Sequence, residues 1–305
     1  MGKHKYSFNL LYLLLLAFVL VASTGFAANR KNLKVKENIA RTVQEFSPLP
    51  LLSGSDTFPV ISAQAALAVD LDSGVTLYEK NPDEPLLPAS TTKIITALVS
   101  LDFYHLDKIL RVGDVSVAGQ KMGLKKGEEI SVKDLLSGLL IYSANDAAEV
   151  LAQNYSGGRE AFITVMNIKA RQLGLEGSFF KNPSGLDGGG HLSTARDLVR
   201  LSSVAIKNET FAQIVATKEE VVKSQDGKIS HKLVNLNKLV GEVEGVLGVK
   251  TGWTENAREN LVTYVDRGGH KIMFALLGSQ DRFGETKELI EWVFKSYEWK
   301  EVSYP

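Results

Sequence analysis

The chain has 305 residues, 44% of them hydrophobic and 23% charged, which is enough apolar material for the core of one large domain. Lys+Arg and Asp+Glu both total 35, so the net charge is zero and no overall field favours nucleic acid as a partner. Cysteine is absent, which excludes disulfides, thiolate metal sites and cysteine nucleophiles. The five histidines lack the spacing of metal ligands, and we expect no metal or other cofactor.

An export signal is predicted over residues 1–27. Positively charged residues precede an apolar run from Leu10 to Ala22, and small residues follow it, which is the order of a secretory signal. The run is short for a spanning helix. Cleavage after Ala27 is expected, with retention as an N-terminal anchor as the alternative. In both cases the remainder of the chain is expected to be exported and to lie outside the cytoplasm.

Residues 28–60 are expected to form a linker, and residues 61–305 a folded catalytic domain. The linker is polar, then rich in Pro and Ser, and has no sustained hydrophobic period. The domain begins with a predicted hairpin. Apolar residues alternate from Ala65 to Val69, a Gly-containing turn follows, and a second strand runs over 75–78.

Helices are predicted through the middle of the chain. From Ser90 the apolar residues lie nearly all round the expected helix, and a helix of this kind is buried. Further helical patterns cover 132–140, 147–153 and 159–173, and Thr194 opens another with the spacing of a capping box.

Strands return towards the C-terminus, at 246–250, 260–265 and 271–277. A Gly-Gly turn joins the last two, and an amphipathic helix over 285–292 closes the chain. Strands at both ends with helices between them predict an α/β (α+β) fold. Its antiparallel sheet would combine the N-terminal and C-terminal strands, and the helical region would be inserted between them.

Ser90 and Lys93 are candidates for nucleophilic catalysis. At a helix start Ser90 lies near free backbone N–H groups, which can stabilise an oxyanion, and Lys93 lies one turn later on the same face. To act as a base Lys93 must be neutral, and burial or a second cation such as Lys250 would lower its pKa. The alternative is a helix-capping serine beside a solvated lysine. The same spacing recurs at Ser178 and Lys181, so it is weak evidence alone.

Two further motifs accompany this pair. Ser143 and Asn145 interrupt a helical pattern, where a loop can present both side chains inward; the alternative is a helix-capping turn. Lys250, Thr251 and Gly252 end a strand, with polar groups suited to a carboxylate and a glycine that permits close approach. The alternative there is a strand end with a solvated lysine.

The three motifs in this order resemble the penicillin-recognising serine enzymes. Other segments resemble the D-alanyl-D-alanine carboxypeptidases specifically, namely 117–124, 134–136, 143–148, 182–186, 193–195 and 248–254. The resemblance covers nearly everything from Ala65 to the last helix. It implies a DD-peptidase/β-lactamase-like fold and the activity of a serine-type D-Ala-D-Ala carboxypeptidase, which trims peptidoglycan stem peptides through an acyl-serine intermediate.

The resemblance also implies catalytic roles. Ser90 would attack the D-Ala-D-Ala bond, Lys93 would take its proton, and Ser143 would pass a proton to the leaving amine. The backbone N–H groups of Ser90 and Trp253 would form an oxyanion hole. β-Lactam antibiotics, which mimic the dipeptide, would be trapped at Ser90 as slow esters.

Substrate-binding roles follow from the same resemblance. Asn145 would hold the substrate backbone, Lys250 and Thr251 would bind the terminal carboxylate beside Gly252, and Arg282 would add positive charge. The partners expected are thus peptidoglycan stem peptides and β-lactams. The chain ends just past the last expected helix, so membrane association is expected through the N-terminal segment only.

Three alternatives remain open. A DD-endopeptidase, which cuts cross-links between stem peptides, has a similarly short layout. A class A β-lactamase would be expected to carry Asp where Ala144 stands and a Glu for the deacylating water. A non-catalytic penicillin-binding or peptidoglycan-binding protein would be expected to lack Ser90 or Lys93, and both are present.

Overall fold

The structure is a computed structural model that describes residues 47–54 and 57–301. Contacts divide the chain into two compact units, Met1–Glu45 and Phe46–Pro305, and the described residues all belong to the second. The predicted export signal lies outside them. No helix among the described residues is long and apolar enough to cross a membrane.

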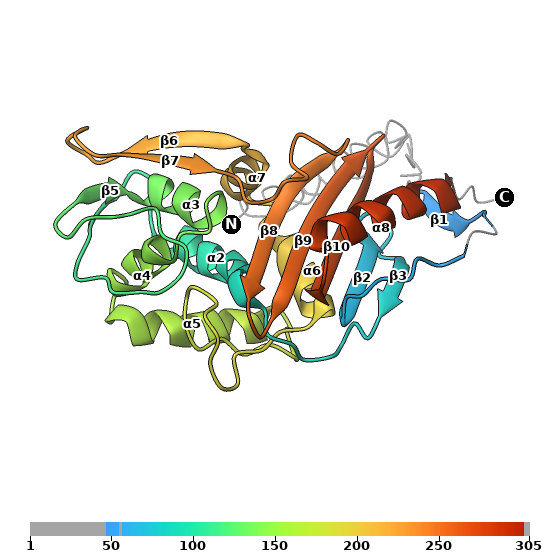
Figure 1. The fold of residues 1–305 in the computed structure, drawn as a ribbon, viewed down its shortest axis with the longest axis horizontal. Coiled ribbons are helices and arrows are strands. Elements are labelled where there is room, and N and C mark those ends of the chain that lie inside the picture. Colours follow the sequence, from blue (N-terminus) through green and yellow to red (C-terminus); the bar gives the residue numbers. More distant parts are fainter. Residues whose placement is uncertain (1–46, 55–56, 302–305) are drawn as a thin grey trace, which may run out of the picture. The chain divides into compact units, whose positions relative to one another are not determined.

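A five-stranded antiparallel sheet forms the centre of the second unit (Figure 1). Its strands stand in the order β3-β2-β10-β9-β8 and run over Thr76–Lys80, Ala65–Asp70, His270–Ser279, Arg258–Arg267 and Val246–Thr254. The first hairpin therefore pairs with the last strands, as the sequence predicted. β8 stands at one edge of the sheet, and no strand among the described residues pairs with its outer edge.

Both faces of the sheet are buried because its strands alternate between two cores. In β10, Ile272, Phe274 and Leu276 belong to one core together with residues of α8 (Arg282–Ser296). Met273, Ala275 and Leu277 belong to the other core, which continues into the helical region. Burial of apolar surface on both sides fixes the register of the strands, since a slip of one residue would exchange the two faces.

The helical region is built around one buried helix. A 3₁₀ turn, η1 (Ala89–Thr92), leads directly into α2 (Lys93–Phe103), which is fully buried from Lys93 to Ser100. The helices packed against α2 are α3 (Val132–Leu140), α4 (Asn145–Gln153), α5 (Gly158–Gln172) and α6 (Ala195–Ala205). In α6 the Thr194 side chain accepts a hydrogen bond from the Asp197 N–H, the cap predicted from sequence.

Several short elements were not predicted. α7 (Glu209–Ala216) packs against β8, and two small sheets pair β4 (Ile109–Arg111) with β5 (Glu129–Ser131) and β6 (Glu219–Lys223) with β7 (Ser230–Val234).

The linker prediction is wrong for one segment. β1 (Leu49–Leu52) pairs with β11 (Tyr297–Lys300), so the folded unit begins before residue 61. Of the four residues of β1 only Pro50 is buried, and no alternation marks the strand in the sequence.

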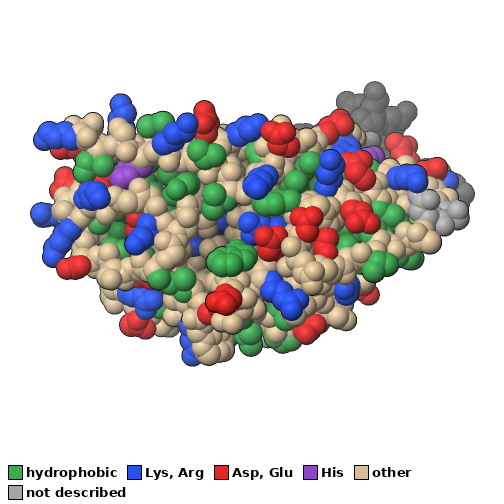
Figure 2. Space-filling view, viewed as in Figure 1, with side chains coloured by type: hydrophobic (Ala, Val, Ile, Leu, Met, Phe, Trp, Pro, Cys, Tyr) green, Lys and Arg blue, Asp and Glu red, His purple; other side chains and the backbone are tan. Residues whose placement is uncertain are grey.

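Charged side chains of both signs are interspersed over the face drawn in Figure 2. This agrees with the zero net charge. Any recognition by charge must therefore depend on local groups rather than on the protein's overall field.

Candidate active site

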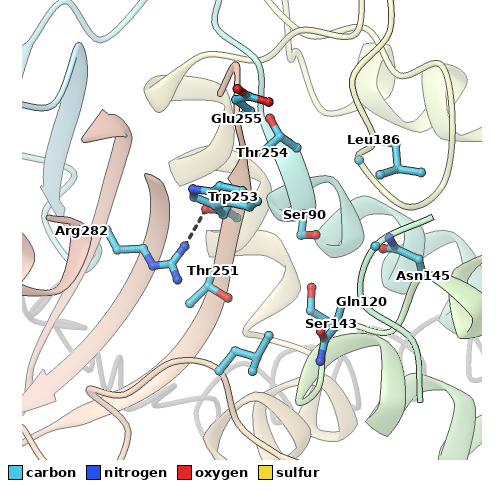
Figure 3. Close-up of a pocket in the computed structure, with 14 residues that line it drawn as sticks. Ser90, Gln120, Ser143, Asn145, Leu186, Thr251, Trp253, Thr254, Glu255 and Arg282 are labelled. Atoms are coloured by element: carbon cyan, nitrogen blue, oxygen red, sulfur yellow. Dashed lines mark hydrogen bonds between the residues drawn. The ribbon is translucent and has the colours of Figure 1, made fainter. Parts of the chain in front are cut away.

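The three sequence motifs converge on one pocket of about 540 Å³ between the helical region and β8 (Figure 3). Its lining includes the predicted site residues Ser90, Ser143, Asn145, Thr251, Gly252, Trp253 and Arg282. The remaining two, Lys93 and Lys250, are buried beside it, with 0% and 1% of their surface exposed. All nine predicted site residues are thus brought together.

Lys93 is the buried centre of the site. Its Nζ lies 2.9 Å from Ser90 Oγ and 2.7 Å from Asn145 Oδ1, and it donates a third hydrogen bond to the Ser184 carbonyl. Burial lowers the pKa of Lys93 well below its usual value, and the nearby charge of Lys250 lowers it further. Two acidic groups, Asp146 and Glu149, oppose this shift. The neutral amine that a base requires is therefore favoured by the setting.

Ser90 does not cap the helix. Pro88 precedes η1 and Thr92 precedes α2, and neither turn has a side-chain capping bond. The capping interpretation of Ser90 is wrong, and so is the solvated interpretation of Lys93. The hydroxyl of Ser90 is instead directed to the pocket and to the Lys93 amine.

Two glycines allow other segments to approach the serine turn closely. A Cβ on Gly252 would lie 3.2 Å from the Ser90 N atom and 2.9 Å from the Pro88 carbonyl oxygen. A Cβ on Gly185 would overlap the Ala89 carbonyl oxygen, at 1.9 Å. Both positions therefore exclude a side chain.

The loop before α4 turns its side chains inward. Ser143 has a φ of 58°, a left-handed conformation that is uncommon for residues other than glycine. Asn145 is the first residue of α4; its backbone N–H donates to Gln120 O at 2.7 Å and its Nδ2 to Ala118 O at 2.7 Å. α4 has no side-chain cap, so the capping interpretation of this motif is wrong. Figure 3 shows Ser143 and Asn145 facing the space beside Ser90.

Lys250 and Arg282 place positive charge at the other wall. Lys250 Nζ donates to the Thr251 carbonyl at 3.0 Å, and Arg282 Nη1 donates to the Gly252 carbonyl at 2.8 Å. Burial, and secondarily the charge of Arg282, lowers the pKa of Lys250 to about 7. Burial also lowers the pKa of Arg282, against the opposing effect of Glu259. The alternative of a solvated lysine is wrong, and so is the predicted strand end, because β8 continues to Thr254.

The side chains of these two cations form no ion pair within the part of the chain that the structure describes. Neither Lys250 nor Arg282 forms a salt bridge with a carboxylate among the described residues, and the buried Arg282 Nε has no hydrogen-bond partner there. Unpaired buried donors beside a pocket are suited to an anionic ligand, and a carboxylate matches the guanidinium geometry. The arrangement therefore offers an anion site next to a serine nucleophile.

Sequence reasoning included residues 182–186 in the resemblance but missed that this loop supports Lys93. Asn182 Oδ1 accepts hydrogen bonds from the backbone N–H groups of Ser184, Gly185 and Leu186, and this turn presents the Ser184 carbonyl to Lys93. The turn-forming composition of 182–186 was visible in the sequence. Its contact with Lys93, 91 residues away along the chain, was not.

His191 lies in a loop, is buried, and contacts the turn that leads into α2. Its Nε2 lies 2.8 Å from Thr92 Oγ1, and its Nδ1 accepts from the Lys181 backbone N–H at 3.1 Å. The second contact leaves the ring proton on Nε2. Burial lowers the pKa of His191 to about 4, with the charge of Lys93 assisting and that of Asp187 opposing.

The remaining wall of the pocket is tied to α4. Asp146 accepts hydrogen bonds from the backbone N–H groups of Met122, Gly123 and Leu124, just after the pocket-lining residues 119 and 120. One residue, Asp146, thus holds the wall while its neighbour Asn145 contacts Lys93.

Comparison with known proteins agrees with this geometry. A sequence model of the D-alanyl-D-alanine carboxypeptidase family matches residues 54–281. The chain is 35% identical to D-alanyl-D-alanine carboxypeptidase DacF of Bacillus subtilis over 77% of this chain, and it spans 63% of that relative's length. It is 33% identical to a D-alanyl-D-alanine endopeptidase of Pseudomonas aeruginosa, with 76% of this chain and 77% of that protein covered.

The fold has a close counterpart among solved structures. The Streptomyces K15 DD-transpeptidase matches with a TM-score of 0.75 and 32% identity, covering 79% of this chain and all of that one. This likeness confirms the predicted DD-peptidase/β-lactamase-like fold.

We predict that Gly185→Ala destabilises the protein, because its φ of +86° and the overlap with Ala89 both exclude a side chain. The expected loss is about 1–3 kcal/mol in the free energy of unfolding. Urea unfolding measures it. Gly188→Ala is the matched control, since its Cβ would meet no heavy atom within 4 Å. Equal effects of the two substitutions would contradict the prediction.

We also predict a pH-dependent contribution of His191 to stability. Its folded pKa of about 4 lies below the ordinary 6.5, so the unfolded chain binds the proton more readily. The contribution is present above pH 6.5 and is lost as the pH falls towards 4, by up to about 3 kcal/mol. Urea unfolding at several pH values measures this contribution. The free energy of unfolding should depend less steeply on pH in His191→Gln than in the wild type. The exposed His105→Gln is the control and should keep the wild-type slope.

Proposed function

The chain belongs to the D-alanyl-D-alanine carboxypeptidase family, and on this basis we propose that it removes the terminal D-alanine from peptidoglycan stem peptides. The observation that carries the proposal is the fully buried Lys93 amine 2.9 Å from the Ser90 hydroxyl. A serine is a weak nucleophile by itself and needs an adjacent base. The catalytic residues assigned from the resemblance are Ser90, Lys93 and Ser143.

Neutral Lys93 has two N–H groups and one lone pair. The N–H groups match the two fixed acceptors, Asn145 Oδ1 and the Ser184 carbonyl, and the lone pair is left for the Ser90 proton. As Ser90 Oγ bonds to the carbonyl carbon of the D-Ala-D-Ala peptide, its proton moves to Lys93. The resulting ammonium returns a proton to the departing amine through the Ser143 hydroxyl. Water then attacks the carbonyl carbon of the ester and gives its proton to Lys93. The bond to Ser90 Oγ breaks, and the proton returns to Ser90.

The substrate would bind along the free edge of β8. An extended peptide can pair with the unpaired edge of a sheet through its main chain. Its terminal carboxylate would meet Lys250, Thr251 and Arg282, and its carbonyl oxygen would meet the N–H groups of Ser90 and Trp253. Asn145 would hold the peptide from the opposite wall. β-Lactams would occupy the same place and acylate Ser90.

A DD-endopeptidase that cuts cross-links is the second candidate. The 33% identity to the Pseudomonas aeruginosa endopeptidase, of which 77% is covered, supports this candidate. Both reactions use the same acyl-serine step, and they differ only in the amine that leaves.

The site of action proposed is outside the cytoplasm. Residues 1–27 would direct export, and any membrane association would come from this segment. The part of residues 28–60 that precedes β1 would act as the linker, and the folded unit that follows would be the catalytic domain.

The proposed activity is tested with two substrates, a pentapeptide stem and a cross-linked stem dimer, whose products are identified by mass. Release of D-alanine from the pentapeptide is expected, and Ser90→Ala should reduce the rate at least about 1,000-fold. Ser178→Ala is the matched control, because Ser178 heads the second S-x-x-K but bonds Asp197 instead of a lysine. Undiminished turnover in Ser90→Ala, or a penicillin adduct on another residue, would refute the mechanism.

A pH profile tests the two lysines separately. Lys93 must be neutral, so protonation should reduce kcat/KM on the acid side, whereas Lys250 must be charged to bind the carboxylate. With a pKa of about 7, Lys250 should cause kcat/KM to fall above pH 7, approaching tenfold per pH unit. Arginine stays charged, so Lys250→Arg should remove this alkaline fall. A wild-type profile that is flat from pH 7 to 9 would contradict the assignment.

A further inference from the structure

The pocket has opposite charges at its two ends along β8. Lys250 lies towards one end, and Arg282 binds the Gly252 carbonyl there. Glu255 lines the pocket at the other end, in the turn that follows β8. Figure 3 shows Glu255 and Thr254 together at one end, on the far side of Trp253 from Thr251.

The carboxylate of Glu255 is available to a ligand. Glu255 is exposed and makes no hydrogen bond or ion pair with any residue that the structure describes. The neighbouring carboxylate of Asp187 is already engaged, since its two oxygens accept from Thr254 Oγ1 at 2.8 Å and Asn256 Nδ2 at 3.0 Å. These bonds anchor the turn on both sides of Glu255. The backbone that carries the free carboxylate is therefore held in place.

The cationic end determines which part of a substrate reaches Glu255. A peptide paired with the β8 edge and anchored by its terminal carboxylate at Lys250 must run along the strand towards Thr254. Glu255 lies four residues beyond Thr251, or about 13 Å at the rise of an extended strand. The reacting carbonyl at Ser90 lies between, so Glu255 faces the acyl side of the scissile bond.

We propose that Glu255 selects stem peptides by pairing with the side-chain ammonium of the diamino acid that precedes D-Ala-D-Ala. This inference rests on the proposed function. A free side-chain amine is cationic at neutral pH, whereas an amine acylated by a cross-link is a neutral amide. The enzyme therefore prefers donor stems whose own diamino acid is not acylated, and the preference applies to trimming and to cross-link cutting alike.

The expected size of the preference is modest, because the pair is exposed to solvent. Exposed ion pairs correspond to about a two- to fivefold change in an equilibrium or rate constant. Screening by salt should reduce it, since the Debye length is about 10 Å at 0.1 M and about 3 Å at 1 M.

Two probes test the inference, α-acetylated lysyl-D-alanyl-D-alanine with its side-chain amine free and the same peptide with that amine acetylated. The ratio of their kcat/KM values is measured for the wild type, Glu255→Gln and Glu176→Gln. We expect the wild type to favour the free amine about two- to fivefold at low salt, and Glu255→Gln to bring the ratio to one. Glu176→Gln, an exposed glutamate that lines a different pocket, should keep the wild-type ratio. Because a ratio is compared, loss of folded protein does not alter it.

Each outcome has one meaning. A wild-type ratio of one, or a ratio that Glu255→Gln leaves unchanged, overturns the role of Glu255. A ratio that falls to one in Glu255→Gln and also in wild type at 1 M salt supports it. Failure of the wild type to release D-alanine from either probe counts instead against the carboxypeptidase activity on which the inference rests.

Discussion

The burial of the Lys93 amine is the constraint on which the rest of the site depends. An ammonium group in the protein interior costs several kcal/mol unless it is paired. Among the described residues, the hydrogen-bond partners of Lys93 are all neutral: Ser90, Asn145 and the Ser184 carbonyl. The group can shift its pKa and lose its charge instead. Three segments distant in sequence must meet at one nitrogen atom for this to occur. The fold can thus be understood as the means of holding a turn, a helix start and a loop around that atom.

These segments can surround the Lys93 amine because their backbones approach one another closely. Gly185 and Gly252 bring two segments against the turn that carries Ser90, one from the supporting loop and one from β8. On the opposite wall, Asp146 binds three backbone N–H groups while the adjacent Asn145 contacts Lys93. The groups that shape the pocket and the groups that tune the lysine are therefore neighbours in the chain. A displacement of the wall would be transmitted to the base.

The elements that could be predicted from the sequence are those that are determined by nearby residues in the chain. The bounds of α3 and the cap at Thr194 follow from periodicity and capping chemistry, and β10 follows from its apolar run and Gly-Gly turn. The pairing of β1 with β11 was not predictable in this way, because β1 buries one residue and its partner lies at the far end of the chain. The anion-binding pocket was foreseen through its motifs. The contacts of Ser184 and His191 were missed, since each depends on residues more than 90 positions away.

The open edge of β8 has a consequence for the solution behaviour of the protein. An unpaired edge strand is a template for pairing with other chains, and proteins commonly shield such edges with charge or short length. β3, the other edge, is only five residues long and ends in Glu79 and Lys80. β8 is nine residues long, and its residues 251–254 line the pocket. Because residues 251–254 of this edge share the pocket with Ser143 and Asn145 of the helical region, we expect that region to hinder pairing of the edge with a second folded sheet.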